Sequence, residues 1–203
     1  MKFSSIFSIA TLAVSALAAP FVEADTKAIR ASAPASVDDV VTLFSGSSQS
    51  ITSKTTQIDV ILKKVQSGET PKSDANPQVL DLVQGIHLDL STIVSSLTTS
   101  AGIPVQKGDV DRLLTVVSAL LTVVLANVRA IVTILGVQPE LVSILKSVVI
   151  LVSNIVTLLT GLVAALLPGL IAALSPLLAG LGNGVLTPIL APLATLLAGL
   201  AGP

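Results

Sequence analysis

The last 57 residues of the chain, Ser147–Pro203, carry no charged side chain, and this absence limits where the segment can lie. The segment contains 27 Leu, Ile and Val residues. Each such side chain is stabilised by roughly 2 kcal/mol when it leaves water. The segment must therefore be covered by a protein core, a bilayer, a second copy of the chain, or an air or solid interface.

Charge is divided unequally along the rest of the chain as well. The stretch from Leu113 to Lys146 adds only Arg129, Glu140 and Lys146. Nearly every other charge lies upstream of Leu113, so the sequence has a polar half and an apolar half. The net charge of −1 gives no basic surface of the kind that binds nucleic acid, and no nucleic-acid partner is expected.

The N-terminus has the pattern of a secretory signal. A short positive start, Met1–Lys2, precedes an apolar run over residues 6–17. Ala16 and Ala18 are small residues at the two positions that a signal peptidase reads. We predict a signal peptide over 1–18, a secreted chain, and a mobile leader over 19–35. The alternative is that the apolar run remains as a membrane anchor.

The residues needed for catalysis or metal binding are scarce. The chain has no Cys and a single His, His87, beside the apolar stripe of its predicted helix. A transition-metal site or a His-based nucleophile triad needs more of these groups. The paired acids Asp38–Asp39 and Asp109/Asp111 are explained by helix starts. We therefore expect no enzyme, no catalytic or metal residues and no cofactor.

Helical signals recur from Ser36 onward. Ser36 and Asp39 have the spacing of a capping box, and apolar residues follow with a seven-residue period. Asn76–Pro77 indicates the start of a second helix, because Asn is a good N-cap and Pro suits the first helical position. A third helix is expected from near Asp109 to Gly136.

A fourth helix is expected from Pro139 to Leu167, ended by Pro168–Gly169. The third and fourth helices keep only thin polar stripes, as helices that form a core would. The first stripe comprises Asp111, Thr115, Ser118, Thr122, Ala126, Arg129 and Thr133, and the second Ser143, Ser147, Asn154, Thr157, Gly161 and Ala164. We predict an all-α fold, a loose antiparallel bundle of about four helices over 36–167, with a polar half, 36–108, and an apolar half, 109–167.

The tail, 168–203, differs from the bundle. Pro176, Pro188 and Pro192 are expected to break it into short, kinked helices with no stable polar face. Residues 172–181 and 191–200 match at seven of ten positions, an internal repeat at an offset of 19. We predict that the tail binds a hydrophobic interface collectively through Leu170, Ile171, Leu174, Leu177, Leu178, Leu181, Leu186, Ile189, Leu190, Leu193, Leu196, Leu197 and Leu200.

Membrane insertion is the alternative. Spans near 113–135 and 141–167 would be long enough to cross a bilayer. Against this, Arg129 would lie deep in one span, and the chain has no Trp or Tyr for the membrane boundaries. Gly182–Asn183–Gly184 before a 19-residue apolar end would fit a lipid-anchor signal, although the polar spacer is missing.

The combination of a signal peptide, a Ser/Thr-rich first half, an apolar second half ending in Leu-Ala-Gly-Leu units and no Cys resembles a family of small secreted proteins of filamentous basidiomycetes. The first half is also similar to fungal hydrophobic-surface-binding proteins. The resemblance covers the whole chain as pattern and composition, with no short diagnostic motif.

This resemblance implies a location in the hyphal wall or extracellular matrix. It also implies a role in forming aerial hyphae and in attachment to hydrophobic surfaces. That role is hydrophobin-like, although the cysteines of hydrophobins are absent. The implied partners are hydrophobic surfaces or the air–water interface, cell-wall polysaccharide and further copies of the chain.

Overall fold

The computed structural model describes residues 34–100, 106–163, 166–179 and 186–201. The described helices all belong to one unit, Ala31–Pro203. The predicted signal peptide, and the predicted leader apart from Pro34 and Ala35, lie outside the described residues. Secretion therefore stays a prediction.

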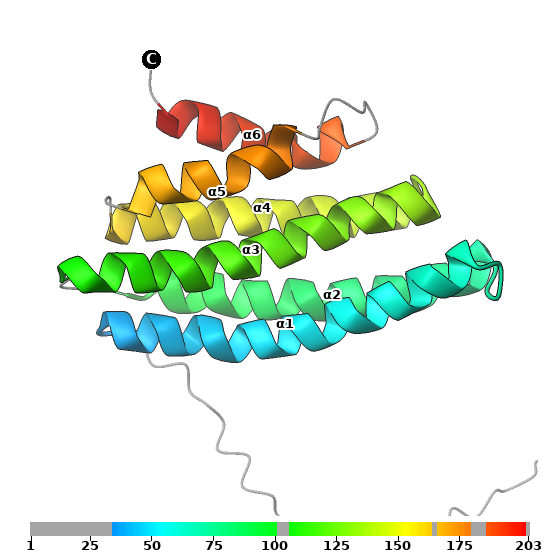
Figure 1. The fold of residues 1–203 in the computed structure, drawn as a ribbon, viewed down its shortest axis with the longest axis horizontal. Coiled ribbons are helices and arrows are strands. Elements are labelled where there is room, and N and C mark those ends of the chain that lie inside the picture. Colours follow the sequence, from blue (N-terminus) through cyan, green and yellow to red (C-terminus); the bar gives the residue numbers. More distant parts are fainter. Residues whose placement is uncertain (1–33, 101–105, 164–165, 180–185, 202–203) are drawn as a thin grey trace, which may run out of the picture. The chain divides into compact units, whose positions relative to one another are not determined.

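The described residues form six helices and no strand, which confirms the all-α prediction (Figure 1). Four long helices are followed by two shorter ones, where the sequence predicted about four helices and a kinked tail. The helices are α1 (Val37–Gln66), α2 (Lys72–Thr98), α3 (Lys107–Leu135), α4 (Pro139–Leu162), α5 (Leu167–Ala179) and α6 (Thr187–Ala201).

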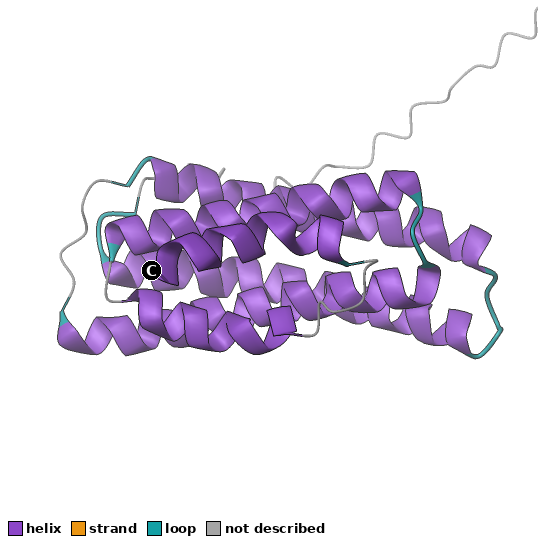
Figure 2. Cartoon of the chain, turned by 90° about the horizontal axis from the view of Figure 1, so that it is seen from above, coloured by secondary structure: helices purple, strands orange, loops and turns teal. Residues whose placement is uncertain are grey.

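The six helices stack as three layers of two. α1 and α2 pair in the first layer, and α3 and α4 in the second lie on α1 and α2, respectively. α5 and α6 in the third layer lie on α3 and α4 in the same way. Helices that follow one another in the chain run antiparallel, and all six share one long direction (Figure 2). One cluster of buried apolar residues runs through all three layers.

The start of α1 is built as the sequence predicts. The Ser36 hydroxyl accepts a hydrogen bond from the Asp39 amide at 3.2 Å, and the Asp39 carboxylate accepts one from the Ser36 amide at 3.0 Å. The Ser36 hydroxyl also donates to this carboxylate, and that bond and the Ala35 amide hold the pKa of Asp39 below its ordinary value. These bonds satisfy amides that a helix start otherwise leaves unpaired.

The start of α2 differs from the prediction. The helix begins at Lys72 behind an extended Pro71, so Asn76 and Pro77 lie inside it rather than at its end. Pro77 is the sixth residue of the helix and deprives it of one backbone hydrogen bond. Ala75 and Val79, on either side of the pair, are fully buried. Their burial favours the extra turn over a new start at Asn76.

Most of the predicted polar stripes of α3 and α4 are exposed, while Ser118 and Ser147 are half-buried and Ala164 lies outside the described residues. Asp111, Thr115, Thr122 and Arg129 of α3 face solvent, and so do Ser143, Asn154 and Thr157 of α4. α3 ends before Gly136, whose φ of 87° suits glycine. A middle layer is covered on two sides, so only a narrow edge of each helix is left for polar residues.

The end of α4 and the effect of the prolines that follow it differ from the prediction. α4 ends at Leu162 and not at Leu167, because the backbone of Val163 is extended. Pro168 stands in the first turn of α5, where its missing N–H costs nothing. Pro176 and Pro192 lie inside α5 and α6 and do not break them. Burial of neighbouring leucines in the core outweighs the poor helix propensity of proline.

Candidate functional site

The uneven charge of the sequence becomes an ordering of charge across the three layers. α1 and α2 contain ten Asp, Glu, Lys and Arg residues, α3 and α4 contain seven, and α5 and α6 contain none. Because the layers are stacked in chain order, the two outer layers of the fold differ most (Figure 1). The third layer is therefore the candidate site for contact with a nonpolar partner.

The structure places most of the predicted interface residues inside the fold. Three side chains, those of Leu177, Leu178 and Leu181, lie outside the described part. Three more, those of Ile171, Leu196 and Leu200, are half-buried. The remaining seven are buried in the core: Leu170, Leu174, Leu186, Ile189, Leu190, Leu193 and Leu197.

The internal repeat of the sequence corresponds to equivalent packing. Within the repeat, Leu174 of α5 stands 19 positions before Leu193 of α6, and just ahead of the repeat Leu170 stands at the same offset from Ile189. All four side chains have 0% exposure. The repeat thus marks the residues by which α5 and α6 pack on the second layer. Sequence reasoning found these residues but not the side of the helix that faces water.

The outer face of the third layer is uncharged and made of small residues. Among the described residues of the chain, large exposed apolar side chains occur only outside this layer, for example Leu88 at 66% and Val137 at 59%. The exposed residues of the third layer are Pro168, Ala172, Ser175, Pro176, Thr187, Pro188, Ala191, Thr195, Ala198 and Gly199. This face requires no charge to be desolvated when it meets a nonpolar phase.

Polar contacts between helices concentrate in the first layer and its contact with α3. The Lys54 ammonium is 2.7 Å from the Asp89 carboxylate, which joins α1 to α2. The Arg112 guanidinium is 2.6 Å from Asp38 and joins α3 to α1. Asn127 Nδ2 donates to Asp59 Oδ1 at 3.5 Å across the same pair of helices. Directional polar contacts therefore supplement apolar packing between α1 and α2 and between α1 and α3.

The third layer is held in another way. Its only polar side chains within the described helices are Ser175, Thr187 and Thr195. Ser175 donates to the Ile171 carbonyl within α5, and Thr187 also has a polar interaction. Nearly all of the attachment of α5 and α6 is therefore apolar burial, which has no preferred direction.

One close approach sets the distance between α5 and α3. A Cβ placed on Gly169 would lie 2.2 Å from Leu114 Cδ2 and 3.2 Å from Leu114 Cγ. A side chain at this position would require the Leu114 side chain to shift, so the glycine permits the α5 backbone to lie directly on Leu114.

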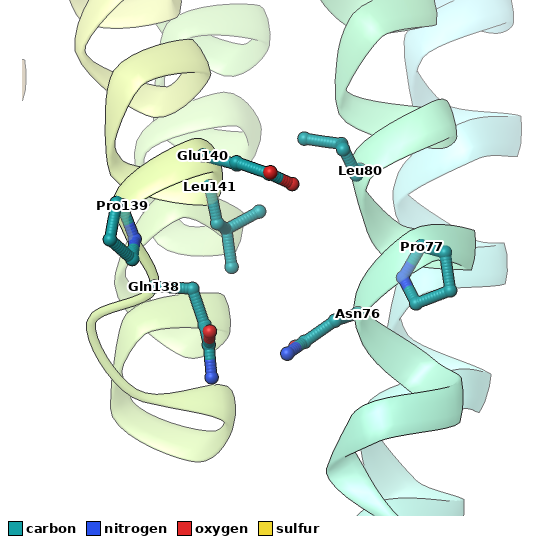
Figure 3. Close-up of a pocket in the computed structure, with 7 residues that line it drawn as sticks. All are labelled: Asn76, Pro77, Leu80, Gln138, Pro139, Glu140 and Leu141. Atoms are coloured by element: carbon teal, nitrogen blue, oxygen red, sulfur yellow. The ribbon is translucent and has the colours of Figure 1, made fainter.

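Sequence reasoning missed a groove between α2 and α4, in which a few polar side chains lie among apolar ones. One pocket of about 310 Å³ is lined by Asn76, Pro77, Leu80, Gln138, Pro139, Glu140 and Leu141 (Figure 3). A second, of about 570 Å³, shares three of these residues and adds Gln84, Ser143, Ile144 and Ser147. Asn76 extends from α2 toward Gln138, and its Oδ1 atom is buried without a partner.

The groove contains one carboxylate and no His or Cys. In the described part of the chain, no three His, Cys, Asp or Glu side chains gather as a metal site would require. The single histidine, His87, is half-buried in α2 and does not line the groove. Amide and hydroxyl groups that can bind a neutral polar ligand are the chemistry that this groove offers.

Two described helices are long and apolar enough to cross a membrane, over Gly108–Leu135 and Pro139–Leu162. In their most apolar stretches, 50% and 39% of the residues are buried inside the fold. The core helices of a soluble protein pass the same length and composition test. Arg129, which would lie deep in a bilayer, faces solvent in this fold.

No protein-family model matches the chain, and neither a curated protein nor a solved structure matches it. The likeness to basidiomycete hyphal-wall proteins therefore stays a resemblance of pattern and composition.

Proposed function

We propose that the chain is a secreted structural protein of the cell surface or extracellular matrix. In this role it attaches the producing cell to hydrophobic surfaces and supports aerial growth, as a hydrophobin does but without cysteines. The observation that supports the proposal is the ordering of charge, from a charged first layer to a third layer with none.

Such an ordering makes the folded protein amphiphilic. At a boundary between water and a nonpolar phase, the first layer keeps its charges hydrated while the third layer meets the nonpolar phase. Only Ala, Gly, Pro, Ser and Thr side chains are fully exposed on the described outer face, so contact there desolvates hydroxyls and backbone but no charge. The fold thus provides an orientation as well as an affinity.

The test is to place charge on the outer face of α6. The triple variant Ala191→Lys, Thr195→Lys and Ala198→Lys changes three exposed residues and no core residue. We expect its adsorption to polystyrene or to hexadecane droplets to fall at least about tenfold, because three ammonium groups must stay hydrated. Adsorption is measured as protein depleted from solution.

The matched control carries the same three charges on the first layer. Ser45→Lys, Gln49→Lys and Thr52→Lys are exposed positions of α1 with the same spacing along the helix. This control should adsorb as the unmodified chain does. Equal adsorption of both triple variants would contradict the assignment of the third layer as the adsorbing side.

Deletion of residues 169–203 is a less specific test in this fold. Removing α5 and α6 would uncover the side of α3 and α4 on which they pack. The truncated chain would then expose a new apolar surface, and its adsorption could increase for that reason. Charge substitutions on the outer face avoid this effect.

A contact with cell-wall polysaccharide belongs to the same proposal, and the groove between α2 and α4 supports it. Its amides and hydroxyls can pair with sugar hydroxyls, and the buried Asn76 Oδ1 lacks a donor. Replacing Gln84 and Gln138 with Ala should reduce sedimentation with insoluble wall polysaccharide several-fold. Adsorption to polystyrene should not change.

Insertion of α3 and α4 into a membrane is the alternative function, supported by their length and apolarity. Fractionation of the producing cells distinguishes the secreted protein from the membrane protein. Recovery from medium or wall without detergent supports the secreted protein. Retention in carbonate-washed membranes until detergent is added would contradict the proposed function.

A further inference from the structure

The third layer covers a second apolar surface. α5 lies on α3 and α6 lies on α4, while the contact between α5 and α6 themselves is smaller. Leu170 and Leu174 of α5 and Ile189 and Leu193 of α6 have no exposed area. The side of α3 and α4 beneath them is therefore hidden from water only as long as the third layer stays in place.

A nonpolar phase can replace the apolar contacts that hold α5 and α6 on α3 and α4. Apolar burial is non-directional and proportional to the area removed from water, so oil or wax can supply the same stabilisation as a protein partner. The half-buried ion pair Lys54–Asp89 cannot be replaced in this way, because a nonpolar phase offers these two charges no polar partner. A nonpolar phase should therefore compete with the third layer and not with the first.

The two helices of the cover also have little stability of their own. α5 has 13 residues and α6 has 15, lengths that are marginal for an isolated helix in water. Pro176 and Pro192 each remove a backbone hydrogen bond from the helix interior. Both helices therefore depend on packing against the second layer, and they would lose this stabilisation if they separated from it.

We infer that the side of α3 and α4 beneath the third layer is a concealed interaction surface for a nonpolar liquid or solid. α5 and α6 are its exchangeable cover, which lifts from α3 and α4 at such a surface while α1 and α2 stay folded. This inference rests on the proposed function and adds that, after first contact through the outer face, firm adsorption requires opening. The absence of Lys and Arg in the third layer favours an oil or solid surface over anionic lipid headgroups.

The first measurement uses the unmodified chain in solution. Hydrogen exchange should be at least about tenfold faster for core amides of α5 and α6 than for core amides of α1 and α2, because the cover opens without global unfolding. A single common rate across all six helices would overturn the inference.

The second measurement locks the cover. The natural chain has no Cys, so Leu114→Cys with Gly169→Cys gives one possible disulfide, between α3 and α5. A Cβ on Gly169 lies 3.2 Å from Leu114 Cγ, the position that the sulfur of Leu114→Cys would take in the same rotamer, so the two new sulfur atoms can bond. The oxidised form should adsorb to hexadecane droplets at least about tenfold less than the same variant after reduction.

The reduced variant is the matched control, since it has the same sequence. Equal adsorption of both forms would overturn the inference and leave the proposed function standing. If neither form nor the unmodified chain adsorbs, the proposed function fails as well. Adsorption of the unmodified chain to phosphatidylcholine vesicles but not to hexadecane would overturn the inference in favour of a bilayer.

Discussion

The first and third layers are the two outer layers of one core, yet different interactions hold them. α1 is joined to α2 by an ion pair and to α3 by an ion pair and a hydrogen bond, in addition to apolar packing. α5 and α6 rely almost entirely on apolar packing. The difference indicates that apolar burial alone is enough to place α5 and α6 in this fold.

The largest expected effect comes from truncating the core of each layer. Phe44 of α1 and Leu193 of α6 both have 0% exposure. Phe44→Ala should destabilise the whole protein by about 3–5 kcal/mol. Leu193→Ala should cost about 2–5 kcal/mol, but we expect this loss to fall on α5 and α6. Urea denaturation followed by circular dichroism measures the first effect, and hydrogen exchange locates the second.

A common loss of protection in all helices of the Leu193→Ala variant would contradict the separation of the two layers. Accelerated exchange confined to α5 and α6 would support it.

A second effect is expected at the close approach of α5 to α3. Gly169→Val places side-chain atoms where Leu114 lies and should cost about 1–3 kcal/mol through overpacking. Gly161→Ala in α4 is the control, because its added Cβ meets nothing within 4 Å. It should be neutral or stabilise by up to about 1 kcal/mol. Thermal denaturation compares the stability of the two variants. Equal changes in melting temperature would contradict a destabilising contact between Gly169→Val and Leu114.

The ion pairs of the first layer should have smaller effects. The Lys54 and Asp89 side chains are only 24% and 23% exposed, against 58% and 76% for Arg112 and Asp38. A double-mutant cycle to Ala should give a coupling of about 1 kcal/mol for Lys54–Asp89 and close to zero for Arg112–Asp38. Both cycles repeated in 1 M NaCl should show weaker coupling. A larger coupling for the exposed pair would reverse this order.

The smallest expected effect is a loss of stability at the start of α1 when the pH is lowered. The hydrogen bond from the Ser36 hydroxyl lowers the pKa of Asp39 below its unfolded value. The stabilisation is therefore present above the unfolded pKa and is lost as the pH falls through the folded pKa. α5 and α6 contain no ionisable side chain. We expect exchange at the first turn of α1, corrected for intrinsic rates, to rise in acid while α6 is unchanged.

Ser36→Ala should remove most of this pH dependence and cost about 0.5 kcal/mol, at the low end for helix caps. A pH response of α1 that survives in the variant would assign the effect to another carboxylate.

Much of the fold follows from local sequence rules. The capping box at Ser36 and the glycine at Gly136 predict helix ends because they act within one turn of the chain. The thin polar stripes of α3 and α4 predict helices covered on most sides. The start of α2 and the end of α4 could not be found in this way. Burial of Ala75 extends one helix, and an extended Val163 ends the other, through contacts distant in sequence.

The candidate site was likewise only partly predictable from the sequence. Residues such as Leu174 and Leu193 can be identified from composition as the source of apolar surface. Their burial against the second layer could not be predicted, because one or two hydroxyl residues in a short uncharged helix, Ser175 in α5 and Thr187 and Thr195 in α6, give only a weak periodic signal for its exposed face. The groove lined by Asn76 and Gln138 forms only because α2 packs beside α4, and no local sequence pattern predicts that contact.

The sequence by itself determined that this protein is helical, that its charge decreases toward the C-terminus, and which leucines must leave water. Only the tertiary structure decided that most of the described leucines of the third layer turn inward and leave alanine, proline, glycine, serine and threonine on its described outer face. The physical reason is that helix formation and hydrophobicity are properties of short segments, whereas the choice of covering partner depends on every other surface that the folded chain makes available.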